Sequence, residues 1–228
     1  MTAPPLTRAQ RVLIVSSELP PGPGGIGAHA HALAVALAEQ GREVRLLGSQ
    51  DYATEAERRE LARTSPVPLT RWPAGGDPLR TALLRRRALR RTIGEFRPDV
   101  VVASGGRVLW LAAEACPRAG LGWVAVAHGT ELGGPGWQRR LTRWALRRAS
   151  RGVAGSGVTA RPVGALGVER PIDVIPNGAD PDRFRPDPVA RQEFRRRHGL
   201  GARLVVLPVG NVTERKGPHL VVEALPRL

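Results

Sequence analysis

Arg11-Val12-Leu13-Ile14-Val15, followed by Gly22-Pro23-Gly24-Gly25-Ile26-Gly27, is the stretch that decides the fold. The first segment is a nearly uninterrupted apolar run, typical of a strand that is buried on both faces of a parallel sheet. The glycine-rich segment leads into residues 25–40, where apolar side chains recur at helical spacing until Gly41. A strand, a glycine-rich loop and a helix form the opening unit of a Rossmann-like fold.

The same alternation continues along the chain. Residues 66–78 are rich in proline and glycine, which predicts a connection. Repeated strand–helix units with apolar strands predict an α/β fold built on a doubly wound parallel sheet. Further strands are predicted over residues 43–47, 99–103, 123–127, 152–156 and 172–175, and helices over 52–63, 79–96, 109–115 and 137–151.

The composition changes near Pro176-Asn177-Gly178, where turn-forming residues gather. We predict an N-terminal Rossmann-like domain over residues 1–170 and an inter-domain connector over 171–200 that contains a polar helix. Residues 201–228 are predicted to begin a second Rossmann-like domain, with a strand over 203–209 and a helix after it. One strand–helix unit cannot bury its own faces, so we expect this second domain to be truncated.

Composition limits the classes of protein that fit. The chain has 228 residues, of which 42% are hydrophobic. It contains no apolar run of membrane-spanning length, and its first residues lack the apolar stretch of a signal peptide. The lone cysteine, Cys116, cannot form an internal disulfide. These features predict a cytoplasmic protein.

The net charge of +15 points to an anionic partner. Nucleic acid, anionic lipid headgroups and phosphorylated substrates all fit such a charge, as do plain solvated helix faces. Aromatic residues make up only 4% of the chain, which leaves few platforms for base stacking, so we expect no nucleic-acid binding. The densest basic stretch, residues 132–168, has no acidic residue and carries Arg139, Arg140, Arg143, Arg147, Arg148, Arg151 and Arg161.

Lys216 is the only lysine in the sequence. It lies between the predicted strand over 203–209 and a predicted helix, in a turn bounded by Gly210 and Gly217. A cation beside a helix N-terminus is a place to hold a phosphate. The alternative is that a single lysine has to fall somewhere in the chain.

His128 follows the predicted strand over 123–127. Ligands of doubly wound sheets bind at the carboxyl ends of the strands, which places His128 beside a ligand crevice. A histidine that simply caps a strand fits equally well. His29 and His31 are two positions apart on a helix and point in different directions, so joint metal binding is not expected.

Asp180-Pro181-Asp182 imitates a metal-binding pair of aspartates, but it lies in a proline-rich turn. We predict that it organises that turn through bonds between side chain and backbone. The sequence offers no cluster with convincing metal-ligand spacing, and no metal is expected.

The glycine-rich loop also matches the dinucleotide-binding pattern G-x-G-x-x-G. An NAD-dependent oxidoreductase is therefore an alternative function. The acidic residue that should hold the ribose is missing after the second strand, where Asp51 comes slightly late.

Several motifs together resemble the family 4 retaining glycosyltransferases, which have the GT-B fold. The most specific is residues 174–186, Val-Ile-Pro-Asn-Gly-Ala-Asp-Pro-Asp-Arg-Phe-Arg-Pro, which is similar to the family signature V-I-P-N-G-V-D-x-x-x-F-x-P. Residues 23–27 with Gly41-Arg42-Glu43-Val44 look like its P-x-G-G-I-x … G-H-x-V opening. Arg97-Pro98-Asp99-Val100-Val101 resembles its K-P-D-V-V strand.

This resemblance implies an enzyme that moves a sugar from a nucleotide-diphosphate sugar to a small-molecule or lipid-linked acceptor, with retention and without a metal or other cofactor. It places Gly24 and Gly25 near the donor phosphates or the acceptor, and His128 at the sugar. Lys216 and the position of Asn211 face the diphosphate; Asn211 replaces an arginine of the family. A lysine there neutralises the charge of the departing nucleoside diphosphate.

Two further expectations follow from the resemblance. The later E-x7-E region of the family would lie beyond Leu228, so we expect this chain alone to be an incomplete enzyme. A truncated, non-catalytic binding module is the remaining alternative. The arginines of the helix over 137–151, with Trp137 and Trp144, suit a peripheral contact with an anionic membrane.

Overall fold

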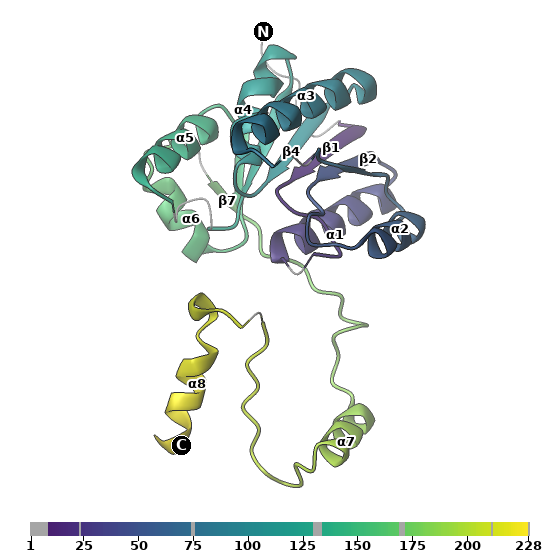
Figure 1. Cartoon of the computed structure of the whole chain (residues 1–228), viewed down its shortest axis with the longest axis vertical. Coiled ribbons are helices and arrows are strands. Elements are labelled where there is room, and N and C mark those ends of the chain that lie inside the picture. Colours follow the sequence, from purple (N-terminus) through teal and green to yellow (C-terminus); the bar gives the residue numbers. More distant parts are fainter. Residues whose placement is uncertain are drawn as a thin grey trace. The chain divides into compact units, whose positions relative to one another are not determined.

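The structure is a computed structural model that describes residues 9–22, 24–73, 76–129, 134–168, 172–210 and 212–227. The chain divides into two compact units, residues 1–177 and 178–228. The first unit contains the whole sheet, whereas the second contains short helices joined by extended chain (Figure 1).

The first unit is built on one seven-stranded sheet in which every pairing is parallel. The strand order is β3-β2-β1-β4-β5-β6-β7, so the chain winds outward from β1 to one edge and then from β4 to the other. This topology confirms the predicted doubly wound α/β fold. The strands are β1 (Arg11–Ser16), β2 (Glu43–Gly48), β3 (Leu69–Arg71), β4 (Val100–Ser104), β5 (Gly122–Ala127), β6 (Arg151–Ala154) and β7 (Ile172–Val174).

Helices cover both faces of the sheet, as Figure 1 shows for α1 (Gly25–Glu39) on one side and α3 (Pro78–Phe96) with α4 (Val108–Arg118) on the other. Side chains alternate along each strand, so Leu13 and Val15 join the core under α3 and α4, whereas Val12 and Ile14 join the core under α1. Both layers are apolar and closely packed, which explains why the central strands read as continuous apolar runs.

Local capping sets where several helices begin. The Thr54 side chain accepts a hydrogen bond from the Glu57 backbone, and the Glu57 carboxylate bonds back to Thr54, which forms a capping box at α2 (Glu55–Thr64). Asp77 caps α3, and Ser156 caps α6 (Gly157–Gly164). The remaining helix of this unit is α5 (Gly136–Leu146).

Three predicted boundaries of the first unit differ from the structure. The connection over 66–78 contains the short edge strand β3, because Leu46 pairs with Leu69 and extends the sheet by one strand. The helix predicted over 137–151 ends at Leu146, because the chain must turn to enter β6 at Arg151. The first domain, predicted to end at residue 170, extends further, because β7 pairs with β6 and belongs to the same sheet.

The second unit contains α7 (Pro188–Arg197), the 3-10 helices η3 (Glu214–Lys216) and η4 (Leu225–Arg227), and α8 (Pro218–Ala224). The polar helix predicted over 190–198 corresponds to α7. The strand predicted over 203–209 is wrong for this structure, where the segment is extended but belongs to no sheet. A β-strand needs a hydrogen-bonded neighbour, and the described residues of this unit contain no other segment that pairs with this one.

Within the described ranges, no helix combines the length and apolar character needed to cross a bilayer.

Candidate functional site

The strand order reverses between β1 and β4, and such a switch point opens a crevice at the carboxyl ends of the strands. The Ser17 backbone N–H donates to the Ser104 carbonyl at 3.2 Å, which joins the two loops that leave these strands. Gly105 then adopts a φ of +77°, and a Cβ there would lie 2.9 Å from Ile26 Cγ2. Glycine at this turn lets the start of α1 approach the end of β4.

His128 lies at this edge of the sheet, directly after β5. Its Nε2 lies 2.9 Å from the hydroxyl oxygen of Ser104, at the end of the neighbouring strand. The ring of His29, on α1, meets the His128 ring edge-on, with centroids 5.2 Å apart and planes at 75°. Three elements thus converge on one imidazole and fix its orientation.

Burial, and secondarily the nearby His128, lower the pKa of His29. Its Nδ1 is buried and has no hydrogen-bond partner within the described part of the chain. His31 lies elsewhere, with Nε2 3.2 Å from the Ser65 hydroxyl oxygen. The expectation that the two α1 histidines point apart is confirmed. Sequence reasoning did not identify Ser104 and His29 as neighbours of His128.

The start of α1 carries an internal carboxylate. The Glu18 Oε1 atom accepts hydrogen bonds from the backbone N–H groups of Ile26 at 3.1 Å and Gly27 at 3.3 Å. A Cβ at Gly24 would lie only 1.7 Å from this same oxygen, whereas one at Gly25 would meet nothing within 4 Å. Gly24 therefore gives Glu18 the room to cap the helix, and the negative carboxylate suits the positive end of the helix dipole.

This capping bears on the predicted role of Gly24 and Gly25 in phosphate binding. Two of the amides at the helix start already hold a carboxylate, so a bound phosphate would have to displace Glu18 or use other donors. The role of the two glycines in donor binding stays a prediction. An acidic residue just before the glycine run was the available sequence signal for Glu18.

A second polar cluster follows β2. Asp51 accepts hydrogen bonds from the Ser49 hydroxyl and from Arg85 Nη2, the latter at 3.2 Å. Partial burial favours the neutral acid, but the Ser49 hydrogen bond and the guanidinium groups of Arg85 and Arg71 hold the pKa of Asp51 below its usual range. Asp51 is thus engaged with local cations.

In the second unit, Lys216 ends η3 and is exposed. Gly217 follows and caps the start of α8. Its φ of +63° lies in the left-handed region, which favours glycine. Asn211 lies outside the described residues. The diphosphate role of Lys216 and Asn211 therefore stays a prediction.

Asp180 accepts hydrogen bonds at Oδ1 from the backbone N–H groups of Asp182, at 3.0 Å, and Arg183, at 3.1 Å. The prediction of a turn organised by bonds between side chain and backbone is thus confirmed for Asp180. Across the described ranges, no group of three or more histidine, cysteine, aspartate or glutamate side chains is arranged to hold a metal ion.

Solved structures define the class of this fold. Anabaena HepE, crystallised with UDP, aligns over 95% of this chain and 57% of its own, with a TM-score of 0.72 and 20% identity. A glycosyltransferase from Rickettsia africae aligns over 96% and 57%, with a TM-score of 0.69 and 15% identity. The fold is that of glycosyltransferases of the GT-B class.

The sequence pattern of Glycosyltransferase Family 4 matches residues 23–183, and the chain belongs to this family. It is 33% identical over 226 residues to a GDP-mannose-dependent α-(1-6)-phosphatidylinositol monomannoside mannosyltransferase of Mycobacterium tuberculosis. It is 31% identical over 252 residues to a glycogen synthase of the same species. These alignments cover 96% of the chain but only 57% and 58% of the relatives, so the chain spans little more than half of their length.

Proposed function

We propose that the protein to which this chain belongs transfers a sugar from a nucleotide-diphosphate sugar to an acceptor hydroxyl. The observation that carries the proposal is the placement of His128. It follows β5, one strand beyond the switch point of a family 4 sheet, and its ring is held by Ser104 at 2.9 Å and by His29. A fixed imidazole at the mouth of the crevice suits a group that contacts the transferred sugar. Family membership does not favour the oxidoreductase alternative.

GDP-mannose is the donor to test first, because relatives at 31–33% identity are named as GDP-mannose-dependent mannosyltransferases. We further propose transfer with retention and without a metal. In this account Lys216 supplies positive charge to the leaving diphosphate, with Asn211 and the Gly24–Gly25 backbone as further contacts. In this proposal the first unit, residues 1–177, forms the acceptor side, and residues 178–228 contain the connector and the start of the donor-binding domain.

The proposal is tested with the complete product of the reading frame that encodes this chain. Labelled GDP-mannose and UDP-glucose are offered in parallel, with and without EDTA, and the anomeric configuration of the product is read by NMR. We expect transfer of one sugar with retention, unchanged by EDTA. Inversion or a metal requirement would overturn those parts of the mechanism, and binding of NAD with no sugar transfer would overturn the function.

We also propose that α5 contacts an anionic membrane at its cytoplasmic face. The helix buries Thr142, Ala145 and Leu146 against the fold. Trp137 is 54% exposed and Leu141 38% exposed. Apolar side chains beside exposed arginines are the pattern of an interfacial helix. Trp144 contributes less, because it is partly buried and the Arg148 guanidinium stacks 4.5 Å from its ring centroid.

Vesicle co-sedimentation tests this contact. Replacing Arg139, Arg140, Arg143 and Arg147 with glutamine should weaken binding to anionic vesicles. Replacing Arg191, Arg195, Arg196 and Arg197 of α7 makes the same change in charge and serves as the control. Equal binding by both variants would refute a contact through α5.

A further inference from the structure

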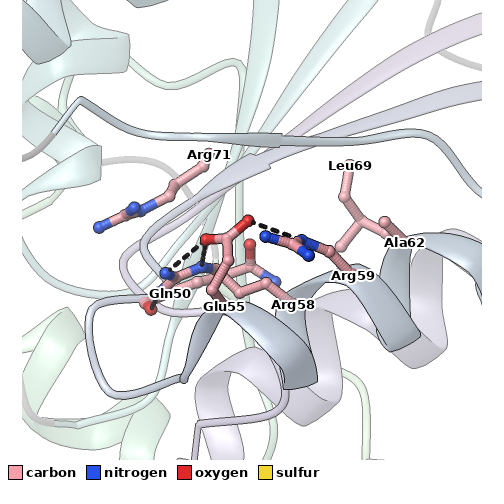
Figure 2. Close-up of a pocket in the computed structure, with 7 residues that line it drawn as sticks. All are labelled: Gln50, Glu55, Arg58, Arg59, Ala62, Leu69 and Arg71. Atoms are coloured by element: carbon pink, nitrogen blue, oxygen red, sulfur yellow. Dashed lines mark hydrogen bonds and ion pairs between the residues drawn. The ribbon is translucent and has the colours of Figure 1, made fainter.

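A pocket of about 360 Å³ opens between α2 and the edge strand β3. It lies at the carboxyl end of the sheet, because Arg71 ends β3 and pairs with Gly48 at the end of β2. Figure 2 shows its side chains, which come from α2, from β3 and from the loop after β2. The lining residues are Gln50, Glu55, Arg58, Arg59, Ala62, Leu69 and Arg71.

Arg58 is held rigidly at the base of this pocket. Its guanidinium donates to the Ala53 and Gln50 carbonyls and, through Nη2, to Glu55 at 2.8 Å. The side chain is only 19% exposed. Glu55 also accepts from Arg59 Nε at 3.3 Å, so one carboxylate is shared by two guanidinium groups (Figure 2).

The other two cations are more accessible. The Arg59 side chain is 78% exposed and that of Arg71 is 41% exposed. Arg71 contacts Asp51 at 3.5 Å, but this carboxylate is already shared with Arg85 at 3.2 Å. Three guanidinium groups and one carboxylate line the pocket, which gives its lining a net positive charge. Guanidinium groups arranged around a concavity suit the oxygens of a phosphate.

We propose that this pocket binds a phosphate-class anion, either a phosphodiester or a phosphomonoester. Ala62 and Leu69 supply an apolar wall for the group that carries it. The pocket and His128 both lie at the carboxyl ends of the strands. Between them, Ser16 and Ser104, the last residues of β1 and β4, pair in register. Because the end of β3 is four strand spacings, or about 19 Å, from the end of β5, which His128 follows, a ligand that reaches both the pocket and His128 is elongated. We assign this elongated ligand as the acceptor of the transferred sugar, with its phosphate group in the pocket. This assignment rests on the proposed transferase function.

Calorimetric titration of the 228-residue chain tests the site without any need for turnover. Inorganic phosphate is one probe, and glycerophosphoinositol is the other, as a soluble phosphodiester headgroup. The double replacement Arg59→Gln with Arg71→Gln should weaken binding of the preferred probe about fivefold or more. Glu55→Gln should strengthen it, because it removes the competing carboxylate.

A matched pair of controls lies on the same helix. Glu60 and Arg63 form an ion pair at 2.7 Å, as Glu55 does with Arg58 and Arg59, but they do not line the pocket. Glu60→Gln therefore matches the charge change of Glu55→Gln. Arg63→Gln combined with Arg91→Gln, an exposed arginine of α3, matches that of the double replacement, and both controls should leave binding unchanged. Circular dichroism establishes that each variant is folded.

The outcomes separate the site from the proposed function. No binding of either probe, or equal effects of the pocket and control variants, would overturn the site whether or not the protein transfers sugar. Tighter binding of the phosphodiester supports the acceptor assignment, whereas tighter binding of inorganic phosphate overturns that assignment and keeps the anion site. A bound anion in a protein without transferase activity would contradict the proposed function alone.

Discussion

The hydroxyl oxygen of Ser104 and Nε2 of His128 lie 2.9 Å apart and link the ends of two neighbouring strands, β4 and β5. Ser104 is 1% exposed, so its hydroxyl is fixed by the sheet. A rigid strand thereby sets the orientation of the imidazole at the crevice.

We predict that Ser104→Ala lowers kcat/KM for sugar transfer about tenfold, because one hydrogen bond that orients His128 is lost. Ser104→Thr keeps the hydroxyl and should recover part of the loss. Steady-state kinetics of the three proteins provide the check. An alanine variant with wild-type kinetics would show that this contact has no part in transfer.

The lowered pKa of His29 predicts a pH-dependent stability. Above pH 6.5 the histidine is neutral in both the folded and the unfolded state. As the pH falls below about 6.5, the unfolded chain takes up the proton first, so the free energy of unfolding decreases. His29→Gln should therefore lose less stability on acidification than the wild type.

Urea unfolding followed by tryptophan fluorescence measures this effect, since all five tryptophans lie in the first unit. His198→Gln, at the C-cap of α7, changes a histidine of the second unit and is the control. Parallel pH profiles for His29→Gln and the wild type would refute the prediction.

Gly24 and Gly25 should respond differently to alanine. Gly24→Ala displaces the Glu18 carboxylate and should cost about 1 kcal/mol of stability through loss of the helix cap. Gly25→Ala meets open space and should stabilise the helix by about 0.5 kcal/mol.

Glu18→Ala supplies the double-mutant test of this interpretation. If Gly24 is needed only to make room for Glu18, then Gly24→Ala should cost almost nothing once Glu18 is gone. Additive losses would mean that the glycine has a separate role. Denaturant melts of the four proteins provide the energies.

Cys116 lies on the buried face of α4 and is 0% exposed, and burial raises the pKa of its thiol to about 12. We therefore expect Ellman's reagent to leave the native protein unmodified near pH 8 and to react once urea unfolds it. Rapid modification under native conditions would mean that α4 opens readily or packs differently.

The parallel sheet was predictable because the strands Arg11–Ser16 and Val100–Ser104 are continuous apolar runs whose helices follow at regular intervals. The edge strand Leu69–Arg71 was not, because three residues between prolines and glycines carry no periodic signal and form a strand only by pairing with β2. The opposite error occurred over residues 203–209, where a strand was predicted and the structure has none. Its apolar pattern is that of a strand, but pairing is a tertiary property that the segment cannot supply.

The site was predictable in the same uneven way. His128 could be placed at the crevice because it follows a strand, and all parallel strands end at one edge. Its neighbours Ser104 and His29 are 24 and 99 positions away, and only the folded sheet brings them together. The pocket that Arg59 and Arg71 line could not be predicted either. Arginines are spread throughout this chain, and only the fold brings these two together.

The most direct test of the central claim is the rate of sugar transfer by a His128→Ala variant of the complete gene product. Because the fold is expected to persist, circular dichroism should match the wild type, with His198→Ala as the matched control. The account predicts that His128→Ala lowers kcat/KM about 100-fold, while His198→Ala transfers sugar at the wild-type rate. Transfer by His128→Ala at the wild-type rate would contradict the assignment of this crevice as the sugar site.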